Sequence, residues 1–314
     1  MSSPRISIVI AAYNAAATVS ETLATVAGQT YRDFELIVVN DGSRDETPAI
    51  LQSHARSWPW MSWVSQENSG VSAARERGIE LARGEYVSFL DADDLWMPNK
   101  LEAQMAEFDR DETVALVCSD ALDFWPDHDE RMTLFQQKAP ARGSVLRQLF
   151  SANFIYSSAV VVRKSALLAA NGFNGGLKVN EDYDLWMRLA EQLKFGYVNQ
   201  VLVRRRMLLS SLTRANQMAC YEQDLKIIDH WVARRPDLFS EDSDQVQCRR
   251  ALILARMGYY HLASRNFSQA RDAYRRAMKL GQHDRATIAR ALAAFFPPAA
   301  LLFWKTKAIA RRSI

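Results

Sequence analysis

A cluster of carboxylates follows directly on an apolar run in the first third of the chain. Residues 86–90 are mostly apolar and fit a strand covered on both faces, and Asp91, Asp93 and Asp94 come directly after them. Carboxylates this close together repel one another unless a cation lies near them. Hard divalent cations such as Mg²⁺ and Mn²⁺ prefer one or two carboxylates, with water and substrate phosphates in the remaining positions. The alternative is an acidic turn that caps the next helix, predicted over residues 97–108.

Other predicted strands also end in polar residues. Apolar runs at residues 5–12, 34–40 and 60–66 are predicted strands, and helical segments follow each of them. This alternation predicts an α/β fold with a mostly parallel central sheet and helices on both faces. Ligands of such sheets bind beyond the carboxyl ends of the strands. The residues at these ends are Tyr13-Asn14, Asp41-Gly42-Ser43, Gln66-Glu67-Asn68 and the carboxylate cluster. We therefore expect one shared cleft.

The next part of the chain offers further charged candidates. We expect a strand at residues 114–118, an excursion or hairpin over residues 121–138, a short helix at 145–150 and a strand at 158–162. Glu181-Asp182-Tyr183-Asp184 then precedes a helix predicted over residues 185–193. Acidic side chains there either stabilise the helix N-terminus or serve catalysis. Arg204, Arg205 and Arg206 follow a strand predicted at residues 195–203, and they face either the cleft or solvent.

After residue 213 the pattern is helical only. We predict a first domain over residues 1–213 and a helical extension over 214–314. Within the extension, residues 246–280 form a predicted helical hairpin. Its small and large residues match one tetratricopeptide-like repeat, at Gly258, Phe267, Ala270, Tyr274 and Ala277. A single repeat does not form an array, so we expect it to cap the first domain rather than to bind peptides.

Composition and charge argue against several classes of protein. The net charge is +3, and residues 285–314 carry six cations and no Asp or Glu, so a nucleic-acid footprint over the main body is not favoured. The three separated cysteines suggest a reducing compartment rather than disulfides or a zinc site. No apolar run is long enough for a spanning helix. The apolar, basic tail at residues 285–314 suits a membrane surface containing anionic lipid, or else a packed helix or a dimer contact.

Taken together, these motifs resemble the family 2 glycosyltransferases with the GT-A fold, over roughly residues 4–213. The matching segments are residues 7–47 with AAYN and NDGS, residues 67–94 with SAARERG and FLDADD, and residues 172–189 with NEDYD. The resemblance implies transfer of one sugar from a nucleotide-diphosphate sugar, with a UDP-sugar favoured, with inversion at the anomeric carbon and with Mn²⁺ or Mg²⁺. The implied acceptor is a glycan or a lipid-linked hydroxyl in surface polysaccharide biosynthesis. It implies a cytoplasmic protein, which could also lie at the inner face of the membrane.

The resemblance also assigns roles to residues. The positions that match the donor nucleotide site are Ala12, Tyr13, Asn14, Asp41, Arg75, Asp91 and Ala92. Tyr13 would pack on the base and Asp41 would accept a hydrogen bond from it, while Asp93 would bind the metal. Asp182 resembles the general base that takes the proton of the acceptor hydroxyl. Candidates for further contacts to the diphosphate or acceptor are Glu181, Asp184, Trp186, Arg205 and Arg206, and Glu181 and Asp184 also compete with Asp182 as base.

Two departures from the family pattern matter. Many relatives have an Arg-x-His sequence at the end of this domain, whereas this chain keeps Arg206 and has Leu208 at the His position. No QxxRW segment is present, which argues against a processive synthase. A second hypothesis is therefore a non-catalytic scaffold that binds a partner through its helical extension. A nucleotidyltransferase ranks lower, because the turn after the first strand has no glycine or basic residue.

Overall fold

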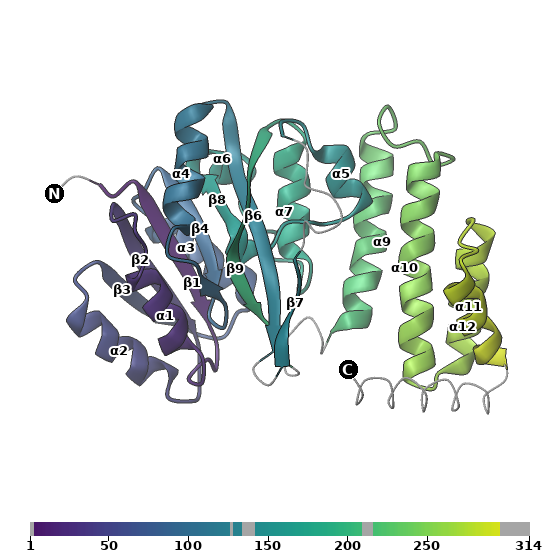
Figure 1. Ribbon diagram of the computed structural model, residues 1–314, viewed down its shortest axis with the longest axis horizontal. Helices are drawn as coiled ribbons and strands as arrows, with labels where there is room; N and C mark the ends of the chain where they lie inside the picture. The colour runs from purple at the N-terminus through teal and green to yellow at the C-terminus, as the bar shows by residue number, and fades with distance from the viewer. Residues whose placement is uncertain (1–2, 126–127, 134–141, 209–215, 296–314) are drawn as a thin grey trace. The chain divides into compact units, whose positions relative to one another are not determined.

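The chain divides into two compact units. The structure, a computed structural model, describes residues 3–125, 128–133, 142–208 and 216–295 (Figure 1). The first unit comprises residues 1–149 and 153–211, and the second comprises residues 150–152 and 212–314. The boundary that the sequence predicts, between residues 213 and 214, falls outside the described residues.

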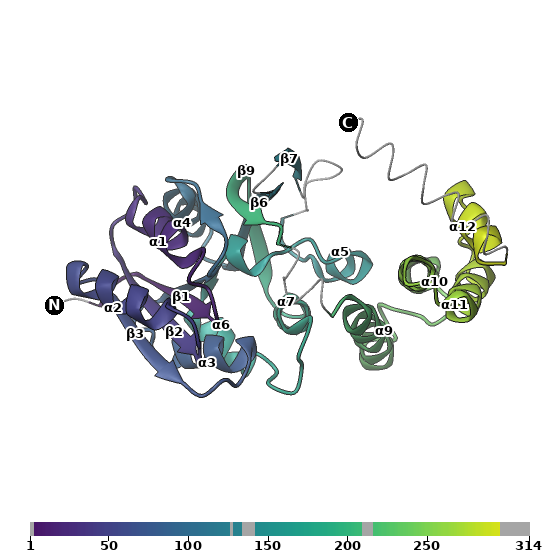
Figure 2. The ribbon, with the colours of Figure 1, turned by 90° about the horizontal axis from the view of Figure 1, so that it is seen from below.

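The N-terminal half of the first unit consists of parallel strands with helices between them. Its elements are β1 (Ile6–Ala12), α1 (Val19–Ala27), β2 (Phe34–Asp41), α2 (Thr47–Ser57), β3 (Met61–Gln66), α3 (Val71–Leu81) and β4 (Tyr86–Asp91). The strands pair in the order β3-β2-β1-β4, all parallel. Figure 2 shows α1 and α2 on one side of these strands and α3 on the other. Helices on both faces explain why β1, β2 and β4 are mostly apolar, whereas the edge strand β3 is more polar.

The close approach of α3 to β1 depends on one glycine. A Cβ atom at Gly78 would lie 2.2 Å from Cγ1 of Val9, so any side chain there would push the helix off the sheet. This fixes the helix that carries Arg75 against the centre of the sheet.

The second half of the first unit extends the same sheet. Its elements are β5 (Leu95–Trp96), α4 (Lys100–Arg110), β6 (Val114–Trp125), β7 (His128–Thr133), α5 (Leu146–Ser151), the 3₁₀ helix η1 (Ser157–Ala159), β8 (Val160–Arg163), α6 (Lys164–Ala169), α7 (Glu181–Ala190) and β9 (Lys194–Arg206). The strand order continues from β4 as β8-β6-β9-β5, with β7 paired to β6. β8 runs antiparallel to both β4 and β6, while β6 and β9 are parallel. The sheet is mostly parallel near the predicted cleft, as expected from the sequence.

The bounds of β6, β9 and α7 differ from the sequence-based expectation. For the two strands, pairing with neighbouring strands outweighs the polarity of the residues at their ends. β6 does not stop at Cys118 but continues to Trp125, where β9 and β7 supply hydrogen-bond partners for its polar end. The hairpin predicted over residues 121–138 is confirmed up to residue 133, and residues 134–138 lie outside the described part. β9 includes all three arginines, and α7 begins at Glu181 rather than at Leu185.

The second unit is helical. It contains α9 (Gln217–Arg234), α10 (Asp244–Ala263), α11 (Phe267–Lys279) and α12 (Arg285–Phe295). The predicted hairpin is α10 and α11, and its small and large positions meet directly. A Cβ on Gly258 would lie 2.8 Å from Cε1 of Tyr274, a fully buried ring. In the described part of the chain, no helix combines the length and the apolarity that crossing a membrane requires.

Candidate active site

The strand register gathers the predicted site residues at one edge of the sheet. Ala12 pairs with Asn40, and Ala11 pairs with Asp91, so the ends of β1, β2 and β4 lie side by side. Asp41 pairs with Gln66 at the end of β3. Carboxyl ends of parallel strands are where ligands of such sheets bind. The register thus places these strand ends together, and the single cleft that the sequence predicts there stays a prediction.

Asp41 lies at the centre of the part predicted to bind the base. It is nearly buried, and it accepts hydrogen bonds from Gln66 Nε2 at 2.9 Å, from the Ser69 N–H at 2.9 Å and from the Gly70 N–H at 2.8 Å. These donors fix the carboxylate in one orientation. Tyr13, in contrast, is 48% exposed, which leaves its ring free to cover a flat ligand.

The turn after β1 is held in place by its neighbour. Asn14 adopts a positive φ of 48°, its N–H donates to Ser43 Oγ at 2.9 Å, and its Oδ1 accepts from the Arg44 N–H at 2.9 Å. Asn tolerates this left-handed conformation better than most residues. Asn14 therefore shapes the turn that presents Tyr13.

Arg75, which the sequence predicts to contact the donor nucleotide, is held by two carboxylates of the site. Its side chain is almost completely buried and donates to Asp91 Oδ1 at 2.7 Å and to Glu181 Oε1 at 2.8 Å. Burial acts to lower the pKa of Arg75, but the carboxylates of Asp91, Glu181 and Asp182 raise it above its ordinary value. The guanidinium is therefore charged and holds these carboxylates in place, and its expected contact to the nucleotide stays a prediction.

The three aspartates after β4 have different environments. Asp94 is buried, and it accepts from Ser158 Oγ at 2.6 Å and from the Arg206 N–H at 2.9 Å. Burial raises the pKa of Asp94 well above its usual range, and the charges of Asp91 and Asp93 raise it further. Asp94 is thus a structural anchor between β4, η1 and β9.

Asp93 is the carboxylate best placed to receive a cation. Among the described residues, no other residue donates a hydrogen bond to its carboxylate or forms an ion pair with it, although Asp91 is held by Arg75. Burial raises the pKa of Asp93 to about 6, and the Asp91 charge adds to this, while Arg206 and Arg205 oppose it. A half-buried carboxylate without a partner fits a divalent cation, which would complete its shell with water and substrate phosphates.

The protein alone does not supply a full set of metal ligands. In the described residue ranges, no group of three or more His, Cys, Asp or Glu side chains is arranged to hold an ion. Such a sparse donor set suits Mg²⁺ or Mn²⁺ bound together with a phosphate substrate, rather than a structural zinc.

The arginines of β9 line this region from the opposite side. Arg205 forms a two-point ion pair with Asp123, with both N–O distances at 2.8 Å, and its guanidinium lies 3.9 Å from the ring centroid of Tyr156. Arg206 donates to the backbone oxygen of Asp93 at 2.9 Å and pairs with Glu21. Leu208, two residues further, is partly exposed.

A short segment that the sequence did not single out connects both halves of the site. Tyr156 stacks beneath Arg205, Ser157 Oγ donates to Asp182 Oδ2 at 3.1 Å, and Ser158 Oγ donates to Asp94. The Asp91 N–H also donates to Ser158 Oγ at 3.1 Å. The only local signal was a run of hydroxyl side chains before the apolar residues of β8. Their roles depend on contacts distant in sequence.

Asp182 lies in the first turn of α7 and is partly exposed. Burial raises its pKa to about 7, and Glu181 adds to this, while Arg75, the Tyr183 N–H and Ser157 act in the opposite direction. A carboxylate with a pKa near neutrality is well matched to accept a proton from a hydroxyl. Its Oδ2 is held by Ser157, and this orientation is what a general base requires.

The two other carboxylates of α7 that could act as the base are held by arginines. Glu181 is committed to Arg75, and Asp184 pairs with Arg188 at 2.9 Å. Trp186 is fully buried and packs near Phe89 and Phe173, with centroid distances of 6.5 and 6.4 Å. Its side chain supports α7 from the core side, and the expected contact of Trp186 to diphosphate or acceptor stays a prediction.

The loop between β4 and β5 is tied to α1. The carbonyl of Ala92 accepts hydrogen bonds from Thr18 Oγ1 at 2.9 Å and from Thr22 Oγ1 at 3.0 Å. Ala92 itself is buried, so its backbone, not its side chain, positions the flanking aspartates.

Comparison with known proteins agrees with this arrangement. The sequence signature of glycosyl transferase family 2 matches residues 7–168, which include the turn after β1 and the aspartate cluster. An uncharacterized glycosyltransferase of Rickettsia typhi is 30% identical over 234 residues, 70% of this chain and 70% of that protein. The chondroitin synthase of Escherichia coli is 28% identical over 202 residues, 64% of this chain and 29% of that protein.

Solved structures show the same fold. S. aureus TarS 1–349 in complex with UDP-GlcNAc has a TM-score of 0.65 at 16% identity, over 94% of this chain and 88% of that one. The mannosyltransferase PcManGT from Pyrobaculum calidifontis, in complex with GDP-Man and Mn²⁺, has a TM-score of 0.56 at 19% identity, over 99% and 81% of the chains. The chain therefore belongs to glycosyltransferase family 2 and has the GT-A fold.

Proposed function

We propose that this glycosyltransferase moves one sugar from a nucleotide-diphosphate sugar to a hydroxyl of a glycan or lipid-linked acceptor, with inversion and with a divalent metal. The proposal rests on two carboxylates of the site, Asp93 and Asp182, whose environments differ. Among the described residues, none donates a hydrogen bond to the Asp93 carboxylate or forms an ion pair with it, whereas Asp182 has a pKa of about 7 and one oxygen held by Ser157. Asp93 is therefore suited to bind a cation, and Asp182 is suited to accept a proton.

The donor would lie across the ends of β1, β2 and β4. Tyr13 would cover the base, and Asp41 has lone pairs left to accept an N–H of its ring. A UDP-sugar is the favoured donor, because the described neighbour TarS was solved with UDP-GlcNAc. PcManGT, solved with GDP-Man and Mn²⁺, makes a guanine donor the second choice.

The diphosphate would lie between Asp93 and the arginines of β9. Asp93, with the exposed side of Asp91, would hold Mn²⁺ or Mg²⁺, and the metal would stabilise the charge that grows on the leaving nucleotide diphosphate. Arg206 is fixed against the Asp93 backbone, and Arg205 lies near enough to lower the Asp93 pKa. Their positive charge would offset phosphate charge without the histidine that Leu208 replaces.

The acceptor hydroxyl would approach Asp182. As its oxygen forms the new bond to the anomeric carbon, Asp182 takes the hydroxyl proton, and the bond from that carbon to the diphosphate oxygen breaks. The proton then leaves to solvent. Attack from the face opposite the leaving group inverts the anomeric configuration.

The biological setting is inferred from relatives. Chondroitin synthase and hyaluronan synthase are among the similar proteins, which supports a role in polysaccharide synthesis. Addition of a single sugar at the cytoplasmic face remains our proposal. The second hypothesis, a non-catalytic scaffold, rests on Leu208 and on the repeat-like hairpin of residues 246–280, whereas the site carboxylates speak against it.

Binding of UDP, GDP, dTDP and CDP, each with Mn²⁺ or Mg²⁺, would test the proposal by calorimetry. We expect one nucleotide to bind only with metal, and Asp93→Asn to abolish that binding while the exposed Glu80→Gln on α3 keeps it. The next step is hydrolysis of the matching sugar donor, which Asp182→Asn should slow about a hundredfold or more. A folded protein that binds no nucleotide would favour the scaffold.

A further inference from the structure

The last described helix, α12, exposes a row of apolar side chains. Ile288 is 39% exposed, Leu292 56% and Phe295 51%, and their spacing of four and three residues places them on one face. The other exposed residues of α12 are Arg285, Ala286 and Ala289, so this face carries no acid. We call Ile288, Leu292 and Phe295 the α12 stripe.

The α12 stripe is not needed to hold the helix in its own unit. The opposite face of α12 is buried through Thr287, Ala291 and Ala294. Arg290 lies over the ring of Tyr259, with its guanidinium 5.0 Å from the centroid. Of the seven exposed large hydrophobic side chains in the described part of the chain, three form this stripe, and such a concentration marks an interaction surface.

The described segment that contains the stripe is basic. Residues 265–295 carry seven of the 39 Lys and Arg residues but only two of the 36 acids, Asp272 and Asp284. The rest of the chain therefore has more acids than cations. Arg271 donates to the Ala294 carbonyl at 3.1 Å, and its guanidinium lies 5.6 Å from the Phe295 centroid, so one cation lies directly beside the stripe.

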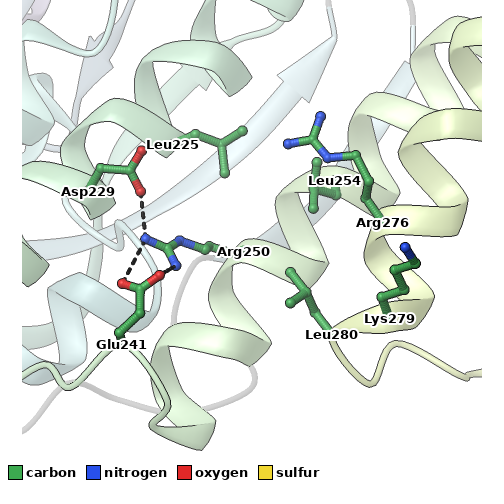
Figure 3. Close-up of a pocket in the computed structure, with 8 residues that line it drawn as sticks. All are labelled: Leu225, Asp229, Glu241, Arg250, Leu254, Arg276, Lys279 and Leu280. Atoms are coloured by element: carbon green, nitrogen blue, oxygen red, sulfur yellow. Dashed lines mark hydrogen bonds and ion pairs between the residues drawn. The ribbon is translucent and has the colours of Figure 1, made fainter.

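Most of these cations have no acidic partner among the described residues. A groove of about 460 Å³ lies in this unit, and Figure 3 shows Arg250 in it, hydrogen-bonded to Asp229 and Glu241. Arg276 and Lys279 of α11 line the same groove, with no bond to the other residues drawn there (Figure 3). The one carboxylate near Arg276 is Asp272, at 3.9 Å on the surface, and no other cation of α11 or α12 forms an ion pair within the described ranges. α9 and α10 together carry five cations and four acids, whereas α11 and α12 carry six cations and one acid.

We propose that the α12 stripe docks on a lipid surface that contains anionic headgroups. Apolar side chains on one helix face enter the boundary between headgroups and acyl chains, and neighbouring Lys and Arg residues add electrostatic attraction. A neutral partner would not use the unpaired cations, and a second copy of this basic surface would repel the first. The sequence after α12 contains four further cations, Lys305, Lys307, Arg311 and Arg312, and no Asp or Glu.

Sedimentation of the full chain with vesicles tests this surface. We expect binding to vesicles of phosphatidylcholine and phosphatidylglycerol in equal parts, little binding to phosphatidylcholine alone, and weaker binding at about 0.5 M salt than at about 0.1 M. Leu292→Glu should lower the partition coefficient roughly tenfold or more, because it removes an inserted side chain and adds a repelled charge. Leu168→Glu is the matched control, since Leu168 is an equally exposed leucine, at 59%, on α6.

Three results would overturn the proposal. These are no binding of the wild type, equal binding to neutral vesicles, and wild-type binding by Leu292→Glu, the last of which would assign the contact to another segment. Size-exclusion chromatography must give the same elution for both variants and wild type, because self-association lost in Leu292→Glu would make the stripe a contact between copies. Nucleotide binding, measured in the same samples, is independent of this test, so failure here leaves the proposed function standing.

Discussion

Arg75 and Glu181 are 106 residues apart in sequence, yet their side chains meet at 2.8 Å in a buried ion pair. The same guanidinium holds Asp91 at 2.7 Å. One cation therefore joins the helix of the predicted base to the aspartate cluster. Because Arg75 lies on α3, which is pressed against β1 at Gly78, both motifs take their position from the centre of the sheet.

Arg75→Ala should destabilise the protein by about 3 kcal/mol, because it leaves the Glu181 carboxylate buried without a partner. We expect a loss of stability at the lower end of the usual range for a broken buried ion pair, because the Asp91 side chain is 42% exposed and solvent screens its charge. Urea unfolding measures the change. The control is Arg77→Ala on the same helix, whose exposed pair with Glu80 should matter by less than about 1 kcal/mol. Equal effects of both changes would contradict the role of Arg75.

The pH dependence of transfer should report Asp182. Its pKa is raised to about 7, chiefly by burial, and a general base acts only when deprotonated. We expect kcat/KM to rise about tenfold per pH unit below pH 7 and to level off above about pH 8. Donor binding must be followed at each pH, because protonation of Asp93, with its pKa of about 6, weakens metal binding at the acidic end. A flat profile of kcat/KM between pH 6 and pH 8 would exclude Asp182 as the base.

Removing the Ser157 hydroxyl should shift that profile. The hydrogen bond to Asp182 favours the ionised carboxylate, so Ser157→Ala should raise the Asp182 pKa and move the rising limb to higher pH. Activity at pH 7 should fall several-fold and recover in part at pH 9, whereas Ser157→Thr, which keeps a hydroxyl, should restore the wild-type limb. A loss of activity that is uniform across pH would instead indicate simple structural damage.

The sequence is informative where the signal is local. The apolar runs of β1, β2 and β4 and their polar ends are contiguous, so the sheet, its edge and the aspartates follow from the pattern alone. The contacts that join these parts, in contrast, are between residues far apart in the sequence. β8 inserts antiparallel between β4 and β6, and only this crossing brings Ser157 and Ser158 to the aspartates.

The same reasoning applies to two motif residues whose side chains are buried. Arg75 and Trp186 lie in motifs that match the family, but a motif does not reveal whether a side chain points to the cleft or to the core. The packing of α3 and α7 against the sheet decides this, and it buries both side chains.

A buried lysine beneath the site gives the last prediction. Lys100 is fully buried, donates to Ser88 Oγ at 2.6 Å and lies 3.9 Å from the Trp96 ring centroid, and burial lowers its pKa well below the usual value. The unfolded chain binds the Lys100 proton more tightly than the native state. Stability should therefore rise with pH between the lowered native pKa and the ordinary value of about 10.5.

Comparison with Lys100→Met isolates this contribution. The Cys118 thiol, whose pKa burial raises to about 12, makes stability fall with pH above about 9 in both proteins, so it cancels in the difference. We expect the free energy of unfolding, from urea titrations at pH 8, 9 and 10, to increase with pH for the wild type relative to Lys100→Met. If the difference were independent of pH, Lys100 would be charged in the native protein, and the positive charge would lie directly under Trp96, whose indole N–H donates to the Ser158 carbonyl at 2.8 Å.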